Sequence, residues 1–219
     1  MLTVDSLHLT IALAPLALYI YWLGLVNLSR RPRLTNGVRD TMALGLSLSG
    51  LIAAGPAELF MPEAAAIRFH GYIWMLLGAF YLLCLTLLVL LLRPRLIVYN
   101  VTIDQLRPVL ANVVQELDRD ARWAGDSLAL PQLGVQLHIE QAPSLRNAQL
   151  VAAGAQQNFA GWRRLELALR SALRGTSGGR NPQGYLLVAC ATLMAVVIVL
   201  SLSRDPQQVA AMLKTLLRR

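Results

Sequence analysis

The sequence has little of the chemistry that enzymes and disulfide-stabilised proteins carry. It contains only two cysteines, Cys84 and Cys190, and both lie inside apolar runs, where cysteine packs as a small hydrophobic side chain. A glycine-rich phosphate loop, a Cys-x-x-Cys pair and a His-Glu-x-x-His motif are all missing. These absences argue against a disulfide framework and against nucleotide-dependent or zinc-dependent catalysis. The sequence predicts no catalytic residue, no metal site and no cofactor.

Lysine is almost absent as well, since Lys214 is the only one beside 19 arginines. The formal net charge of +8 raises the question of nucleic acid as a partner. Residues 94–184, however, hold ten arginines against seven acids, which is too mild an excess for a nucleic-acid surface. We therefore attribute the charge to the basic loops that flank membrane spans on the cytoplasmic side, and we predict no nucleic-acid partner.

Long apolar runs dominate what is present. Hydrophobic residues make up 56% of the chain and the mean hydropathy is +0.51, as in a multipass membrane protein. Residues 1–93 contain three predicted transmembrane helices, at about 7–28, 41–60 and 71–92. A fourth predicted span begins at Tyr185, within a last region, 185–219, that ends in an amphipathic helix after Asp205 and Pro206. The first run lacks the basic flank of a signal peptide, so we expect a retained helix.

Residues 94–184 read as a water-facing α+β domain with a linker, inserted between the third and fourth spans. Strands are predicted at 96–101 and 147–153, a hairpin at 122–130 turning at Gly125, and a strictly alternating strand at 135–140. Helices are predicted from about Thr102 and over 162–174, and a flexible linker over 175–184. This order favours helices on one face of a largely antiparallel sheet, attached to a membrane bundle of four α-helices.

The second span is rich in small residues, and two pairs of them have the spacing that lets helices approach closely. This set indicates either a pore lining or oligomer seam, or ordinary packing within the bundle. Its members are Gly45, Ser47, Ser49, Gly50 and Ala54.

A second candidate set consists of basic amphipathic helices. The pattern over 162–174 fits a helix lying on anionic headgroups, and it fits equally a helix that covers the sheet and turns its charges to water. The residues predicted to contact the membrane surface here and in the terminal helix are Trp162, Arg163, Arg170, Arg174, Lys214 and Arg218.

The basic residues near the span ends predict the orientation. Nine lie on the side of the first loop and the domain: Arg30, Arg31, Arg33, Arg39, Arg93, Arg95, Arg170, Arg174 and Arg180. Five lie opposite: Arg68, Arg204, Lys214, Arg218 and Arg219. The positive-inside rule therefore predicts an inner-membrane protein of bacterial type with a cytoplasmic domain and both termini outside.

Together these patterns predict a multipass membrane subunit that is not an enzyme. Its partners would be the lipid bilayer and either copies of itself or other membrane proteins, and its cytoplasmic domain would serve in docking, sensing or assembly. The alternative is a small oligomeric channel or membrane-perturbing effector, with the second helix lining a pore. No Asp, Glu, Lys, Arg or His lies deep within any predicted span, which argues against a coupled transporter.

Overall fold

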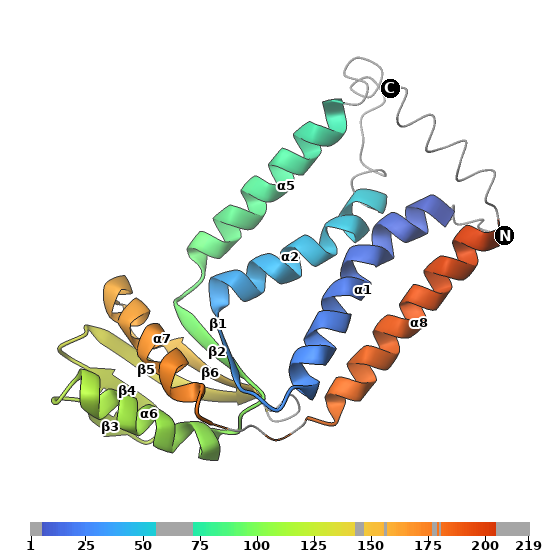
Figure 1. Cartoon of the computed structure of the whole chain (residues 1–219). Helices are drawn as coiled ribbons and strands as arrows, with labels where there is room; N and C mark the ends of the chain where they lie inside the picture. The colour runs from blue at the N-terminus through green and yellow to red at the C-terminus, as the bar shows by residue number, and fades with distance from the viewer. Residues whose placement is uncertain are drawn as a thin grey trace. The chain divides into compact units, whose positions relative to one another are not determined.

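The structure is a computed structural model that describes residues 6–55, 72–142, 147–155, 157–176, 179 and 181–204. The chain divides into two compact units, which are described separately here. The helical unit comprises Met1–Trp22, Met42–Leu90 and Leu186–Arg219, and the sheet unit comprises Leu23–Thr41 and Leu91–Tyr185. Figure 1 shows the long helices α1, α2, α5 and α8, and the sheet with the shorter helices α6 and α7. The predicted terminal helix, with Lys214 and Arg218, lies outside the described residues.

Three of the described helices are long and apolar enough to cross a bilayer, which indicates association with a membrane. They are α1 (Ser6–Leu28), α5 (Tyr72–Leu91) and α8 (Gln183–Arg204). The predicted number was four, and the described residues do not supply a fourth. The predicted second span corresponds to α2 (Gly37–Ala54), which is not among these three helices. It begins ahead of the expected residue 41 and therefore includes Arg39 and Asp40 in its first turns.

Six antiparallel strands form one sheet. Their order across the sheet is β1-β2-β6-β5-β4-β3, and every neighbouring pair is antiparallel. The strands are β1 (Arg33–Asn36), β2 (Arg95–Tyr99), β3 (Arg122–Ala124), β4 (Ser127–Leu130), β5 (Val135–Ala142) and β6 (Asn147–Ala152). The predicted antiparallel sheet is confirmed. The predicted hairpin is also confirmed, and its turn places Gly125 at φ 62°, a conformation that glycine adopts without a Cβ penalty.

The first strand, β1, was not predicted, because residues 29–40 read as a loop. It pairs with β2 so that Arg33 faces Tyr99 and Asn36 faces Leu96. β1 and β2 are thus the two arms of a β-hairpin whose turn is replaced by residues 37–94, which contain α2 and α5. The predicted domain limits of 94–184 therefore omit one strand of the sheet that the structure builds.

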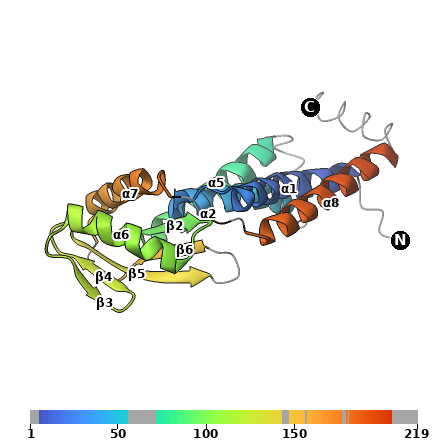
Figure 2. The same ribbon diagram turned by 60° about the horizontal axis from the view of Figure 1, so that its bottom comes forward.

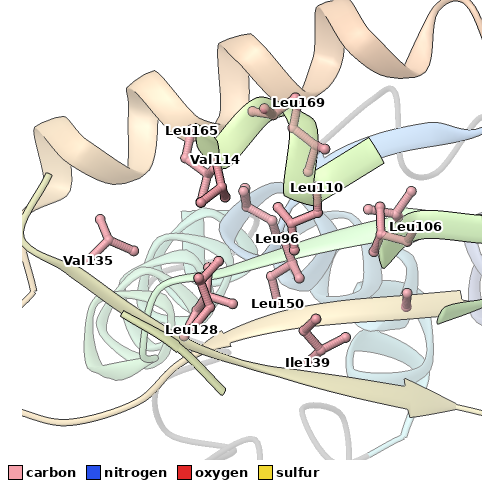
Figure 3. Packing of buried hydrophobic residues seen from close by; sticks show 14 of the residues in the cluster. Leu96, Leu106, Leu110, Val114, Leu128, Val135, Ile139, Leu150, Leu165 and Leu169 are labelled. Atoms are coloured by element: carbon pink, nitrogen blue, oxygen red, sulfur yellow. The ribbon is translucent and has the colours of Figure 1, made fainter. Parts of the chain in front are cut away.

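Two amphipathic helices cover one face of the sheet, as predicted. α6 (Ile103–Leu117) and α7 (Phe159–Leu173) pack against each other and lie over the strands (Figure 2). Figure 3 shows Leu165 and Leu169 of α7 beside Val114 and Leu110 of α6, with Leu96 beneath them. The alternating strand β5 supplies the other side of this core, burying Val135, Leu137 and Ile139 while its Gln136, His138 and Glu140 remain exposed.

Candidate functional site

The most elaborate polar structure in the sheet unit surrounds β2, where the ends of the long helices join the sheet. We call this region the junction. It consists of Leu23, Val26, Asn27, Ser29, Gly37, Asp40, Thr41, Arg95, Ile97, Tyr99, Asn100, Asn181 and Gly184.

At the end of β2 that carries Asn100, the last turns of α1 and the first turn of α8 meet. Asn27 and Asn181 are fully buried, and the Asn181 side chain donates to Asn27 Oδ1 at 3.2 Å. The Asn181 backbone N–H donates to the Asn27 carbonyl at 3.2 Å, and its Oδ1 accepts from Gln183 N–H at 3.1 Å, which caps α8. The Asn100 side chain donates to the Ser29 carbonyl. The Asn27 and Asn181 amides are paired with each other, so separating them would leave unsatisfied polar groups.

Glycine allows the close approach of α8 to α1 at this point. A methyl group on Gly184 would lie 2.9 Å from Leu28 Cγ and 3.1 Å from the Gly24 carbonyl oxygen. The first separation is one that real Cβ atoms essentially never show, so any larger residue would require the Leu28 side chain to shift. The predicted flexible linker 175–184 therefore ends in a tightly packed segment, since Asn181 and Gly184 are both buried.

The first turn of α2 is bonded to both ends of β2. Arg95 donates from Nη2 to Thr41 Oγ1 at 3.1 Å, and its side chain fills the space over Gly37. The Tyr99 hydroxyl donates to Asp40 Oδ1 at 2.5 Å. These bonds fasten α2 to the face of β2 that the domain helices leave free.

That second face of β2 is apolar where α1 ends. Ile97 and Tyr99 pack there against Val26, with Leu23 beside them. Because Leu96 and Val98 point the other way into the main core, β2 is buried on both faces. The sheet unit therefore includes the ends of the membrane helices as part of its packing.

The predicted small-residue set of α2 is partly buried within the helical unit. A methyl group on Gly50 would overlap the main-chain carbonyl oxygen of Ile11 in α1, and one on Gly45 would overlap the Leu85 side chain of α5. The Tyr81 hydroxyl donates to the Gly45 carbonyl at 2.6 Å. Ser47 is buried, whereas Ser49 and Ala54 are half-buried. Gly45 and Gly50 therefore serve contacts with two different helices of the same chain, which is the packing interpretation.

The residues predicted to contact the membrane surface do not share one environment in the structure. Trp162 is buried in the domain core and donates from Nε1 to Gln157 Oε1 at 2.8 Å, so its ring is not available to headgroups. Arg163 and Arg174 are exposed, and Arg170 donates to Glu166 Oε1 at 2.8 Å. The apolar stripe of α7 thus covers the sheet, and membrane contact by its arginines stays a prediction.

Two other polar side chains of the domain, Asp118 and His138, form hydrogen bonds within the domain. Asp118 is 1% exposed and accepts from the N–H groups of Asp120, Gln132 and Leu133 at 3.0, 2.9 and 3.4 Å, which holds the turn before β5. His138 shares a hydrogen bond of 3.0 Å with Ser127 Oγ across β4 and β5. Within the described residues, no three His, Cys, Asp or Glu side chains gather as metal ligands.

Sequence reasoning missed the junction almost entirely, although one of its signals is local. Asn181 followed by Pro182 is a helix start, with a capping side chain and a proline in the first turn. The burial of Asn27 and the pairing of β1 have no such local signal. Comparison with known proteins adds nothing further: no family model, no curated protein and no solved structure matches the chain.

Proposed function

We propose that this chain is a non-catalytic multipass subunit of a membrane complex. It packs with copies of itself or with partner membrane proteins and uses its α+β domain for docking, sensing or assembly. Three helices of spanning length and composition support its place in a membrane. The absence of a catalytic motif from the sequence supports the non-catalytic role.

The junction is the observation that carries this proposal. A domain that works independently of its membrane anchor needs only an exposed linker. Here buried Asn27 and Asn181 join the ends of α1 and α8, and Asn100 and an apolar cluster join the end of α1 to β2. Because the ends of α1, α2 and α8 belong to the sheet unit, rearranging the long helices strains β2 directly. A partner bound to the domain would then sense the packing of the spans, and the spans would sense the partner.

We include α2 as a fourth span. Residues 41–54 carry no charge, and close contacts at Gly45 and Gly50 compensate for the scarcity of large apolar side chains. With four spans, and nine basic residues on the domain side against five on the other, the domain is cytoplasmic and both termini are outside the inner membrane. A periplasm-active reporter fused after Pro62 is expected to be active, and one fused after Gly178 silent. The reverse result would contradict the orientation.

The junction is tested by replacing Asn27 and Asn181 together with leucine in the full-length protein. The double variant is expected to insert normally but to lose its partners or fall to a smaller assembly on a native gel. Its matched control is Arg122→Ala on the exposed strand β3, which is expected to keep the wild-type assembly. A junction variant that retains the same assembly and the same co-purifying proteins would refute the proposed role.

The alternative of a channel or membrane-perturbing effector needs the small residues of α2 to line a water-filled path. The contacts of Gly45 with Leu85 and of Gly50 with Ile11 favour the subunit proposal instead. Replacing Gly45 and Ser49 together with leucine separates the two functions. The subunit proposal expects a changed assembly and no conductance from the wild-type protein in planar bilayers, whereas single-channel currents that the double variant abolishes would establish the alternative.

A further inference from the structure

A cleft of about 420 Å³ lies at the end of the sheet where β2 begins and β6 ends. Its size falls within the range of small-ligand sites. The Ala152 N–H donates to the Pro94 carbonyl at 2.9 Å and so joins the two strands beside it. Most of the lining is apolar, and the lining residues are Arg93, Pro94, Ala152, Gly154, Ala155, Gln157 and Phe159.

The wall formed by the start of α7 is held in place by hydrogen bonds. Gln157 donates to the carbonyls of Ala153 and Gln136 at 2.6 and 3.0 Å and accepts from Trp162. Asn158 caps α7 by accepting from Ala160 N–H at 2.9 Å. The cleft is therefore preformed, which lowers the entropic cost of binding.

Phe159 is the unusual member of this wall. It is 75% exposed although it is the first residue of a helix whose apolar stripe is otherwise buried. The Gln157 and Asn158 bonds fix the backbone beside it, and this backbone places the ring in the lining of the cleft. An exposed aromatic ring beside an arginine is the pair that proteins place at a membrane–water interface.

The chain itself places the cleft next to lipid. Arg93 is the first charged residue after the apolar run of α5, and Leu91, two residues before it, is 76% exposed. If α5 crosses the bilayer, Arg93 and Pro94 stand at the headgroup layer. Arg93 is exposed and has no ion-pair partner among the residues that the structure describes. Its guanidinium is therefore free to donate two hydrogen bonds to a phosphate.

We propose that this cleft binds one anionic phospholipid, with its phosphate on Arg93 and its glycerol and first acyl carbons against Phe159 and Pro94. The single charge and the apolar lining fit a lipid better than an acidic peptide, which would need several cations. The inference rests on the membrane location within the proposed function, but not on the assembly role of the junction.

The test uses the full-length protein in nanodiscs of phosphatidylcholine, with and without phosphatidylglycerol, and counts retained lipids by native mass spectrometry. The wild type is expected to retain one phosphatidylglycerol selectively. Arg93→Gln is expected to weaken this retention about fivefold, the effect of one basic residue near an anionic surface, and Phe159→Ser is expected to weaken it as well.

Matched controls are Arg122→Gln, an exposed arginine on β3, and Leu167→Ser, an exposed apolar residue of the same helix α7; both are expected to leave retention unchanged. Equal losses in the Arg93 and Arg122 variants would reduce the effect to general surface charge and overturn the site. If soluble inorganic phosphate stabilised the protein as much as phosphatidylglycerol does, the cleft would recognise phosphate alone, and the lipid site would also be overturned. A variant of this site is expected to lose lipid selectivity while its native assembly stays intact. A variant of the junction is expected to lose its assembly while lipid selectivity stays intact, so the two tests are distinguishable.

Discussion

The two units of this protein differ in which side chains they bury most completely. In the sheet unit the fully buried side chains are large aliphatic ones, such as Leu106 and Leu165, which are 0% exposed. In the helical unit many large aliphatic residues stay exposed, as Leu90 does at 75%, while Gly45, Ser47 and Gly50 are buried together with a few large residues such as Leu85. Water drives large apolar surfaces together, whereas lipid solvates them as well as protein does. Helices in lipid therefore associate where small residues let their backbones touch.

This difference means that the same residue type contributes differently to stability in each unit. A leucine of α6 holds the domain together, whereas an exposed leucine of α5 only matches the surrounding hydrocarbon. A glycine, conversely, is a contact point between long helices and a turn or cap in the domain. Substitutions that exchange the two kinds of residue should therefore have opposite effects in the two units, and they give direct tests of the comparison.

The largest effect is expected for Leu110→Asp in α6. Leu110 is fully buried in the domain core, so an unpaired carboxylate there should cost at least about 4 kcal/mol and unfold the domain. Limited proteolysis of the full-length protein in detergent should show residues 94–176 cut rapidly. The control is Leu167→Asp on the exposed side of α7, which should change stability by less than about 0.5 kcal/mol. Equal protection of both variants would contradict the core assignment.

The second test asks whether the sheet unit is complete without the membrane. Residues 94–175 alone are predicted to fold, but they lack β1 and the packing of Leu34 on the core. Joining residues 29–36 to 96–176 through an Asn-Gly turn restores the β1–β2 hairpin without α2 and α5. This chain should melt cooperatively and be more stable than 94–175 by about 2 kcal/mol, from the regained strand and apolar contact.

Circular dichroism melts of the two fragments measure that difference. A matched fragment with Leu34→Ser should lose about half of the gain, because it keeps the hairpin but removes the apolar contact. If the fragment without β1 proves as stable as the one with it, β1 contributes only to positioning the membrane helices.

The smallest effect, and the sharpest comparison, comes from two glycines in long helices. Gly50→Ala places a methyl group against the Ile11 carbonyl of α1 and should destabilise the helical unit by about 1 to 2 kcal/mol. Gly78→Ala in α5 meets nothing within 4 Å and should stabilise it by up to about 1 kcal/mol through helix propensity. Steric-trap or denaturant unfolding in bicelles would compare them. Shifts of the same sign would argue against close packing of α1 and α2.

The sequence predicted those parts of the fold that local pattern encodes. The uncharged runs identified α1, α5 and α8, and alternation at Val135, Leu137 and Ile139 identified β5. The face formed by Leu106, Leu110 and Val113 identified α6. In each case the pattern of apolar residues reflects which faces of the element meet water, lipid or protein. This pattern lies within a short stretch of the chain, so it can be read from the sequence alone.

Only the tertiary structure decided which surfaces meet. The four residues of β1 acquire their hydrogen bonds from β2, which follows after two intervening helices, so no local pattern specifies the pairing. The stripe that contains Trp162 fits a membrane surface and a sheet equally well. In the folded protein it packs on the sheet, because burying it against β5 and β6 removes apolar surface from water. Likewise the small-residue pairs that contain Gly45 and Gly50 encode close approach but not its partners. A contact between helices depends on two surfaces, and the sequence of α2 describes only one of them.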